Sequence, residues 1–364
     1  MEVKRPWQGK MTAVERISSL LSGKPIDRVP LSLFDMSCGM GWFCARNVGY
    51  PIDSIFNDPE KSFWAQLWTQ EQYGYDGSPV FGDASYGGWE FGGEIKYPET
   101  QKEQAPCVSR YPVESKEDID RLELHDVRTA GMLPLAMQFS KMQEQFGVPI
   151  TFPCGGPFTY AGNIVSMDRL CRWMIKEPAL VHRLLRLCTD HILQVAQHWV
   201  DTFESERIVA RDILSLEDNR IISPQQFEEF AFPYFKEVHE KVLGIGVKRF
   251  NTHICGEQNS NLPHLAQIPM GDPGIVSFGH EISLTTAIRY FGDKCVIAGN
   301  IDPVVIQTGT AQQVYELSKR CIEEAKYAPR GYILTAGCDV PPLTPPYNIY
   351  IMMKAINDFG WYNS

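Results

Sequence analysis

Residues 248–256 read Lys-Arg-Phe-Asn-Thr-His-Ile-Cys-Gly. This is a short run that contains apolar residues and ends at a glycine. Such a run predicts a buried strand, here Lys248 to His253, and stretches with helical periodicity separate it from seven similar runs. Eight strands alternating with helices are what a closed parallel barrel requires. The sequence therefore predicts an α/β fold, a (β/α)8 TIM-type barrel, whose other strands are Arg28 to Phe34, Gly77 to Phe81, Val148 to Pro153, Arg207 to Arg211, Ile275 to Phe278, Cys295 to Ala298 and Tyr332 to Thr335.

The intervening stretches carry helix signals. Met167 to His198 has helical character, and Pro178 divides it into two helices. Pro224 to Leu243 begins with a capping pattern, since Ser223 precedes a proline in the first turn. This alternation favours βα units over a sandwich of two sheets.

Two segments exceed a minimal barrel. A helix over Thr12 to Gly23 precedes the first strand as an N-terminal extension, and Gly82 to Asp126 is rich in Gly, Trp and Pro. We interpret the second segment, residues 82–126, as an insertion or lid at the barrel mouth. Without repeats or a flexible linker, residues 1–364 are expected to form one domain; a two-domain alternative would divide within the insertion.

Composition limits the function classes. Thirty-four Lys and Arg residues against 44 Asp and Glu residues give a net charge of −10, which would repel nucleic acid and anionic membrane surfaces. The N-terminal sequence does not resemble an export signal, and no apolar run approaches the ~18 residues of a spanning helix. The ten cysteines then predict reduced thiols in a cytoplasmic protein.

The end of the fifth predicted strand offers metal ligands. His253 and Cys255 are two residues apart and can face one centre, and Cys338 follows the eighth strand at the same end of a barrel. One imidazole and two thiolates suit zinc, and the absence of a Cys-x-x-Cys pair favours a catalytic over a structural ion. Spacing alone leaves the alternative that these cysteines are small buried hydrophobic residues.

Three further residues are candidates at the mouth. Glu281 follows the sixth strand and is the expected fourth, catalytic ligand, with His280 as its competitor. Polar residues that follow strands usually cap a helix or close a turn, which we expect for Asp35, Asp83 and Asn300. Asp212 is the expected exception, a catalytic residue, because no obvious helix begins directly after it.

Several short motifs follow one another along nearly the whole chain. They are Glu15-Arg16, Gly23-Lys24-Pro25-Ile26-Asp27-Arg28-Val29-Pro30, Gly156-Pro157-Phe158-Thr159, Ile222-Ser223-Pro224, His253-Ile254-Cys255-Gly256, Gly299-Asn300-Ile301-Asp302-Pro303 and Gly337-Cys338-Asp339-Val340-Pro341. In this order they resemble the uroporphyrinogen decarboxylase superfamily, and within it the cobalamin-dependent methyltransferase branch that includes methylcobalamin:coenzyme M methyltransferases.

The superfamily contains two chemistries. Decarboxylases carry an arginine-rich segment after the first strand that holds the porphyrinogen carboxylates, whereas here residues 34–44 contain no arginine and Arg46 is the first. The methyltransferase branch resembles this chain in its His-x-Cys and distant Cys. The resemblance therefore implies that His253, Cys255 and Cys338 bind zinc, with Glu281 as a labile ligand.

The implied reaction moves a methyl group between a corrinoid and a small thiol or a methylated O, N or S compound. Zinc would hold a substrate thiol as its thiolate, or would assist a leaving heteroatom in the opposite direction. The chain has no Asp-x-His-x-x-Gly segment for cobalamin, so a separate corrinoid protein is the implied partner. A uroporphyrinogen decarboxylase-like decarboxylase of a less acidic substrate and an inactive scaffold that binds a corrinoid protein are the alternatives.

Overall fold

Six parallel strands form the sheet at the centre of the molecule. The computed structural model describes residues 9–33, 41–82, 85–100, 103 and 105–362. Each strand pairs with the next along the chain, in the order β3-β4-β5-β6-β7-β8. Six of the eight predicted strands are therefore confirmed: β3 (Ile150–Pro153), β4 (Ile208–Leu214), β5 (Arg249–Ile254), β6 (Gly274–Phe278), β7 (Cys295–Ile301) and β8 (Tyr332–Ala336).

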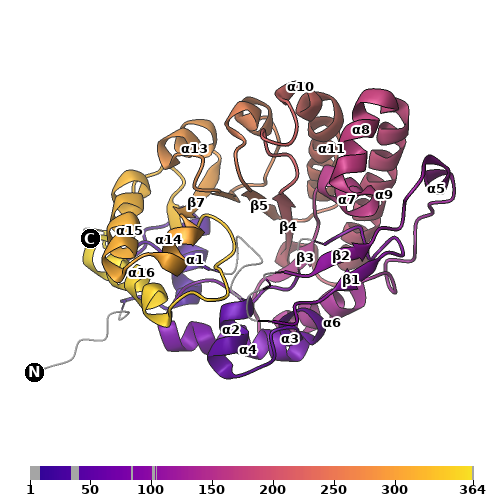
Figure 1. Cartoon of the computed structure of the whole chain (residues 1–364). Coiled ribbons are helices and arrows are strands. Elements are labelled where there is room, and N and C mark those ends of the chain that lie inside the picture. Colours follow the sequence, from indigo (N-terminus) through magenta and orange to yellow (C-terminus); the bar gives the residue numbers. More distant parts are fainter. Residues whose placement is uncertain (1–8, 34–40, 83–84, 101–102, 104, 363–364) are drawn as a thin grey trace, which may run out of the picture.

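Helices follow the strands and form an outer ring around them (Figure 1). The predicted break before Pro178 and the helical stretch from Pro224 are both confirmed. The helices after β3 to β8 are α7 (Pro157–Val165), α8 (Met167–Lys176), α9 (Pro178–Thr202), α10 (Pro224–Gln226), α11 (Phe232–Gly244), α12 (Leu262–Leu265), α13 (Leu284–Phe291), α14 (Pro303–Thr308), α15 (Ala311–Ala325) and α16 (Pro346–Phe359). Two 3-10 helices, η1 (Ser205–Arg207) and η3 (Asn259–Asn261), and a π-helix that joins α10 to α11, η2 (Phe227–Ala231), complete this part of the chain.

The first two predicted strands are not formed as named strands in the described part of the chain, which corrects that expectation. Single parallel bridges join Leu31 to Leu334 of β8, and Ser32 to Asp76. These segments thus continue the order of strands beyond β8, in the positions that a barrel assigns to them.

Side chains explain why no ladder forms over the second predicted strand. The Gln66 side-chain amide accepts a hydrogen bond from the N–H of Val80 (2.9 Å) and donates one to the carbonyl oxygen of Val80 (2.8 Å). The Gln143 amide donates to the carbonyl oxygen of Pro79 at 2.8 Å, and proline itself offers no N–H. Side chains thus satisfy backbone groups of Pro79 and Val80 that a strand ladder would have used.

The helices that precede β3 pack around the closing segments. Apart from one short helix in the insertion, they are α1 (Ala13–Leu21), α2 (Gly41–Val48), α3 (Ser54–Asn57), α4 (Pro59–Tyr73) and α6 (Leu133–Gln145). The predicted N-terminal helix is confirmed as α1, which begins with a capping box of Thr12 and Glu15. Its buried Arg16 forms ion pairs with Asp27 and Asp76, which tie the extension to the barrel.

The expected insertion carries an antiparallel hairpin of β1 (Glu94–Lys96) and β2 (Cys107–Arg110), followed by α5 (Lys116–Asp120). It packs on α7 and α9: Asn163 donates to the carbonyl oxygen of Tyr86 at 2.9 Å, and Phe91 lies against His191. Its role as a lid stays a prediction.

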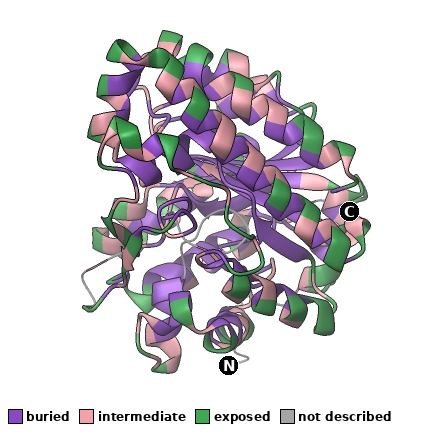
Figure 2. Ribbon diagram, turned by 90° about the vertical axis from the view of Figure 1, so that its right-hand side faces the viewer, coloured by how far each residue is buried: buried purple, intermediate pink, exposed green. Residues whose placement is uncertain are grey.

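Buried residues concentrate on the strands and on the helix faces turned toward them (Figure 2). All residues of β3, β6 and β8 are buried, so these strands have apolar neighbours on both faces. Within the described ranges, none of the helices has the length and apolar character that crossing a bilayer demands.

Candidate metal centre

Three sulfur and nitrogen ligands meet where β5 and β8 end. One ligand atom each of His253, Cys255 and Cys338 lies within 4.8 Å of the other two, and no other such group of three is found among the residues that the structure describes. The two sulfur atoms, Sγ of Cys255 and Sγ of Cys338, are 3.7 Å apart, and both cysteines are free thiols. The structure thus brings together the three residues that the sequence singled out.

The strand alternation turns His253 toward the barrel interior. On the same strand, Phe250 stacks on His239 of the outer helix α11 and therefore points outward. Because side chains alternate along a strand, His253, three residues further on, points inward. Nδ1 of His253 lies 2.8 Å from Oγ of Ser277 on β6. Nε2 is buried and has no hydrogen-bond partner in the described structure. A buried ring nitrogen without a partner is costly, and a metal ion would satisfy it.

The thiols have an environment that a cation would change. The adjacent thiol of Cys255 and burial raise the pKa of Cys338, and His253 offsets this only in part. A divalent cation reverses this balance because coordination holds cysteine as its thiolate. The donor set and the unpartnered Nε2 therefore fit zinc.

Glycines allow the loops around this cluster to approach closely. A Cβ on Gly337, which precedes Cys338, would lie 2.9 Å from the backbone nitrogen of His280. A Cβ on Gly279 would lie 2.9 Å from the backbone nitrogen of Gly256 and 2.6 Å from Oε2 of Glu281. The loops after β5, β6 and β8 therefore pack on one another without intervening side chains.

Glu281 lies beside the cluster but is not part of the group within 4.8 Å. Its Oε1 lies 3.3 Å from Nη2 of Arg220, and its Oε2 lies 3.5 Å from Nδ1 of His280. His280 is more exposed, and its Nε2 is 4.0 Å from Oδ2 of Asp302. Of the two expected fourth ligands, Glu281 is the one packed over Gly279.

Sequence reasoning missed the pair of Asp218 and Arg220, which follows β4. Asp218 accepts from Nε of Arg220 at 2.9 Å and also contacts its Nη2. The second oxygen of Asp218 accepts from the backbone N–H of Glu257 at 2.9 Å, so the pair holds the loop that begins at Cys255. Asp218 lies four residues beyond the end of β4, and its contact with Glu257 is distant in sequence, so no local pattern identified the pair.

Asp212 lies elsewhere, which corrects the expectation that it lines the mouth. Strand β4 extends to Leu214, three residues beyond the expected end, so Asp212 lies inside the strand and points outward. Its Oδ2 lies 2.7 Å from Nε2 of His239, whose Nδ1 lies 2.8 Å from the carbonyl oxygen of Pro269. Both side chains are fully buried, which indicates a structural pair.

The other polar candidates have local roles or cannot be placed. The Asn300 amide donates to the carbonyl oxygens of Gly279 (3.1 Å) and Ile282 (2.6 Å), in agreement with the expected turn-closing role. Asp35 and Asp83 lie outside the described residues.

Glu217 is a buried carboxyl group that the sequence reasoning did not identify. Burial raises its pKa to about 7, although hydrogen bonds from the Thr159 hydroxyl (3.0 Å) and the Leu216 N–H (3.0 Å) act in the opposite direction. Glu217 is in the same loop as Asp218, and its side chain lies beside Gly156, which precedes the first residue of α7. A carboxyl group in this environment is neutral over much of the acidic pH range.

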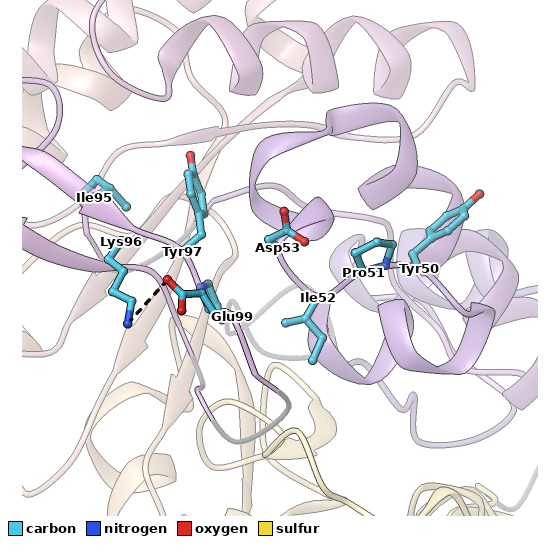
Figure 3. A pocket seen from close by; sticks show the side chains of 9 residues that line it. Tyr50, Pro51, Ile52, Asp53, Ile95, Lys96, Tyr97 and Glu99 are labelled. Carbon is cyan, nitrogen blue, oxygen red and sulfur yellow. Dashed lines mark ion pairs between the residues drawn. The ribbon is translucent and has the colours of Figure 1, made fainter.

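A hollow on the surface lies between residues 50–53, after α2, and the hairpin residues 95–99 (Figure 3). Lys96 and Glu99 form an exposed ion pair at its edge, with Nζ and Oε1 3.9 Å apart. The hollow shares no residue with the cluster of His253, Cys255 and Cys338 and offers no comparable set of ligands.

Comparison with known proteins covers almost the whole chain. The profile of the uroporphyrinogen decarboxylase (URO-D) family matches residues 12–359. A methylcobamide:CoM methyltransferase (MtbA) of Methanosarcina mazei is 24% identical over 96% of this chain and 99% of its own length. A uroporphyrinogen decarboxylase of Myxococcus xanthus is 25% identical over 68% of this chain and 70% of its own. A solved methyltransferase structure from Methanosarcina mazei has the same fold, with a TM-score of 0.76, 23% identity and coverage of 96% and 99%.

Proposed function

The chain belongs to the uroporphyrinogen decarboxylase (URO-D) family, and from this premise we propose that it is a corrinoid-dependent methyltransferase. It moves a methyl group between a corrinoid on a partner protein and a small thiol or a methylated O, N or S compound. The observation that carries this proposal is the cluster of His253, Cys255 and Cys338 with its unpartnered imidazole nitrogen. The full-length similarity to a methylcobamide:CoM methyltransferase supports it.

His253, Cys255 and Cys338 would hold zinc, and Glu281 would serve as the fourth, exchangeable ligand. When bound, zinc would lower the pKa of a coordinated substrate thiol, so that the thiolate is present at neutral pH. The chain's own residues set the geometry, because Ser277 fixes the His253 ring and the glycine contacts bring the two thiols together.

In the thiol direction, the substrate sulfur attacks the methyl carbon on cobalt in line with the Co–C bond. The S–C bond forms as the Co–C bond breaks, both electrons of the broken bond remain on cobalt, and the thiol proton passes to solvent. Methylcob(III)alamin is thereby converted to cob(I)alamin, and the thiol becomes a thioether. The open end of the barrel at β5 and β8 is where the partner would present the corrin ring.

Decarboxylation is the second candidate, favoured by the match to the Myxococcus xanthus enzyme. Arg46 is the first arginine after the first predicted strand, and it donates to the carbonyl oxygen of Thr344 at 2.7 Å. This guanidinium therefore already serves a loop, which weakens a porphyrinogen-binding role.

An anaerobic assay tests the proposal. Zinc-loaded protein is mixed with methylcobalamin and either 2-mercaptoethanesulfonate or 2-mercaptoethanol, and loss of the methylcobalamin spectrum is followed. We expect catalysed loss with at least one thiol and none with Cys338→Ser. Release of CO₂ from a porphyrinogen, with no methyl transfer, would instead establish the decarboxylase.

A further inference from the structure

A second charged pair borders the candidate metal centre. Arg220, in the loop after β4, and Glu281, in the loop after β6, approach to 3.3 Å between Nη2 and Oε1. The Arg220 side chain is 63% exposed and that of Glu281 is 20% exposed. The carboxylate that lies beside the cluster is thus paired with a cation from another loop.

Asp218 fixes this cation in place. Its side chain is only 7% exposed, and it accepts hydrogen bonds from Nε of Arg220 and from the backbone N–H of Glu257. A bidentate contact with a buried carboxylate orients the planar guanidinium. Arg220 therefore keeps its position when Glu281 moves.

The guanidinium packs directly on the loop that carries Cys255. Gly256 has φ +72°, and a Cβ there would lie 3.1 Å from Nη2 of Arg220 and 2.2 Å from Oδ2 of Asp218. The pair of Asp218 and Arg220 therefore packs against the residue that directly follows Cys255, a proposed metal ligand.

We propose that Arg220 is a positioning residue. It holds the Glu281 carboxylate away from the metal while the substrate sulfur occupies the fourth coordination position. This inference rests on the proposed function. A carboxylate displaced from a cation into a half-buried site needs another counter-charge, because an unpaired charge there pays a desolvation penalty. Arg220 supplies that charge at the position the structure shows.

The charge balance makes the arrangement reversible. One guanidinium serves two carboxylates, Asp218 and Glu281, so its hold on the second is weaker than in an isolated pair. Glu281 can then return to the metal when the product leaves. Without Arg220, Glu281 stays on the metal and competes with the incoming thiol.

Cobalt(II) in place of zinc tests this by absorption spectroscopy, because sulfur coordination adds a thiolate-to-cobalt charge-transfer band. Wild-type protein is titrated anaerobically with 2-mercaptoethanol, an uncharged thiol that cannot form an ion pair with Arg220. We expect Arg220→Ala to need about tenfold more thiol for half-saturation, which is within the range typical of residues that orient a metal ligand. Arg220→Lys should restore part of this loss, and equal cobalt content and thermal midpoints verify the fold.

The Glu281→Gln background separates a positioning role from direct contact. There, Arg220→Ala should have no further effect, since the residue on which Arg220 acts is neutral. Equal titrations of wild type and Arg220→Ala would overturn the inference, and so would an undiminished loss in the Glu281→Gln background. A wild-type cobalt protein that responds to no thiol would overturn the proposed function and this inference with it.

Discussion

Nδ1 of His253 lies 2.8 Å from Oγ of Ser277, and the two residues are register partners on the neighbouring strands β5 and β6. The contact fixes the imidazole ring and leaves Nε2 for another partner. When Nε2 binds a metal, Nδ1 carries the proton and donates it to the serine oxygen. The sheet register thus determines which nitrogen of His253 is available.

Ser277→Ala should weaken metal binding without unfolding the protein. Loss of a hydrogen bond to a metal-binding histidine typically costs 10- to 100-fold in affinity, so we expect roughly tenfold weaker zinc binding in competition with a chromogenic chelator. The matched control is Ser318→Ala, which removes a buried hydroxyl that donates to the carbonyl oxygen of Val314 in α15. Equal zinc affinity of Ser277→Ala and wild type would contradict a ligand role for Nε2.

Asp212→Ala should affect stability and leave the metal centre intact. The change leaves Nε2 of His239 buried without its partner, which costs about 3 kcal/mol of unfolding free energy. Chemical denaturation measures this loss, and zinc content should equal that of wild type. A variant of normal stability that has lost activity would show instead that Asp212 acts in the reaction.

Glu217 predicts a pH dependence of stability. Its pKa is about 7 in the folded protein and 4.5 as the ordinary value, so folding favours the protonated form. The stability this gives is fully present below pH 4.5 and is lost as the pH rises through 7. Glu217→Gln should match wild type at pH 4 and exceed it by about 2–3 kcal/mol at pH 8 in denaturant titrations.

Thr159→Val provides the companion variant for this test. The Thr159 hydroxyl lowers the pKa of Glu217 in the folded protein, so its removal should extend the loss of stability to higher pH and make it larger. A wild-type stability that is flat between pH 4 and pH 8 would contradict the buried, neutral carboxyl group.

Hydrophobic runs predicted the six strands that pair as a sheet because burial on both faces leaves a clear pattern, as in Ile275 to Phe278. The same pattern could not show that Gln66 and Gln143 satisfy the backbone around Val80, since side chains distant in sequence do so. Strand ends were also uncertain. Three further residues in β4 placed Asp212 within the strand and changed the direction of its side chain.

The cluster of His253, Cys255 and Cys338 was predictable because His253 and Cys255 are close in sequence and Cys338 follows another strand at the same end of the barrel. Arg220 was not, because its position depends on Asp218 and on a glycine in a different loop. Its charge carries no spacing pattern relative to Glu281, which lies 61 residues further along the chain.

The metal content of the purified protein shows whether His253, Cys255 and Cys338 hold zinc. Wild-type protein, Cys255→Ala and the control Cys107→Ser, which changes an exposed cysteine on β2, are purified from zinc-supplemented cells and measured by inductively coupled plasma mass spectrometry. We predict about one zinc per chain in wild type and Cys107→Ser, and none in a folded Cys255→Ala. Metal-free wild-type protein, or a Cys255→Ala variant that retains its zinc, would contradict zinc binding at this cluster.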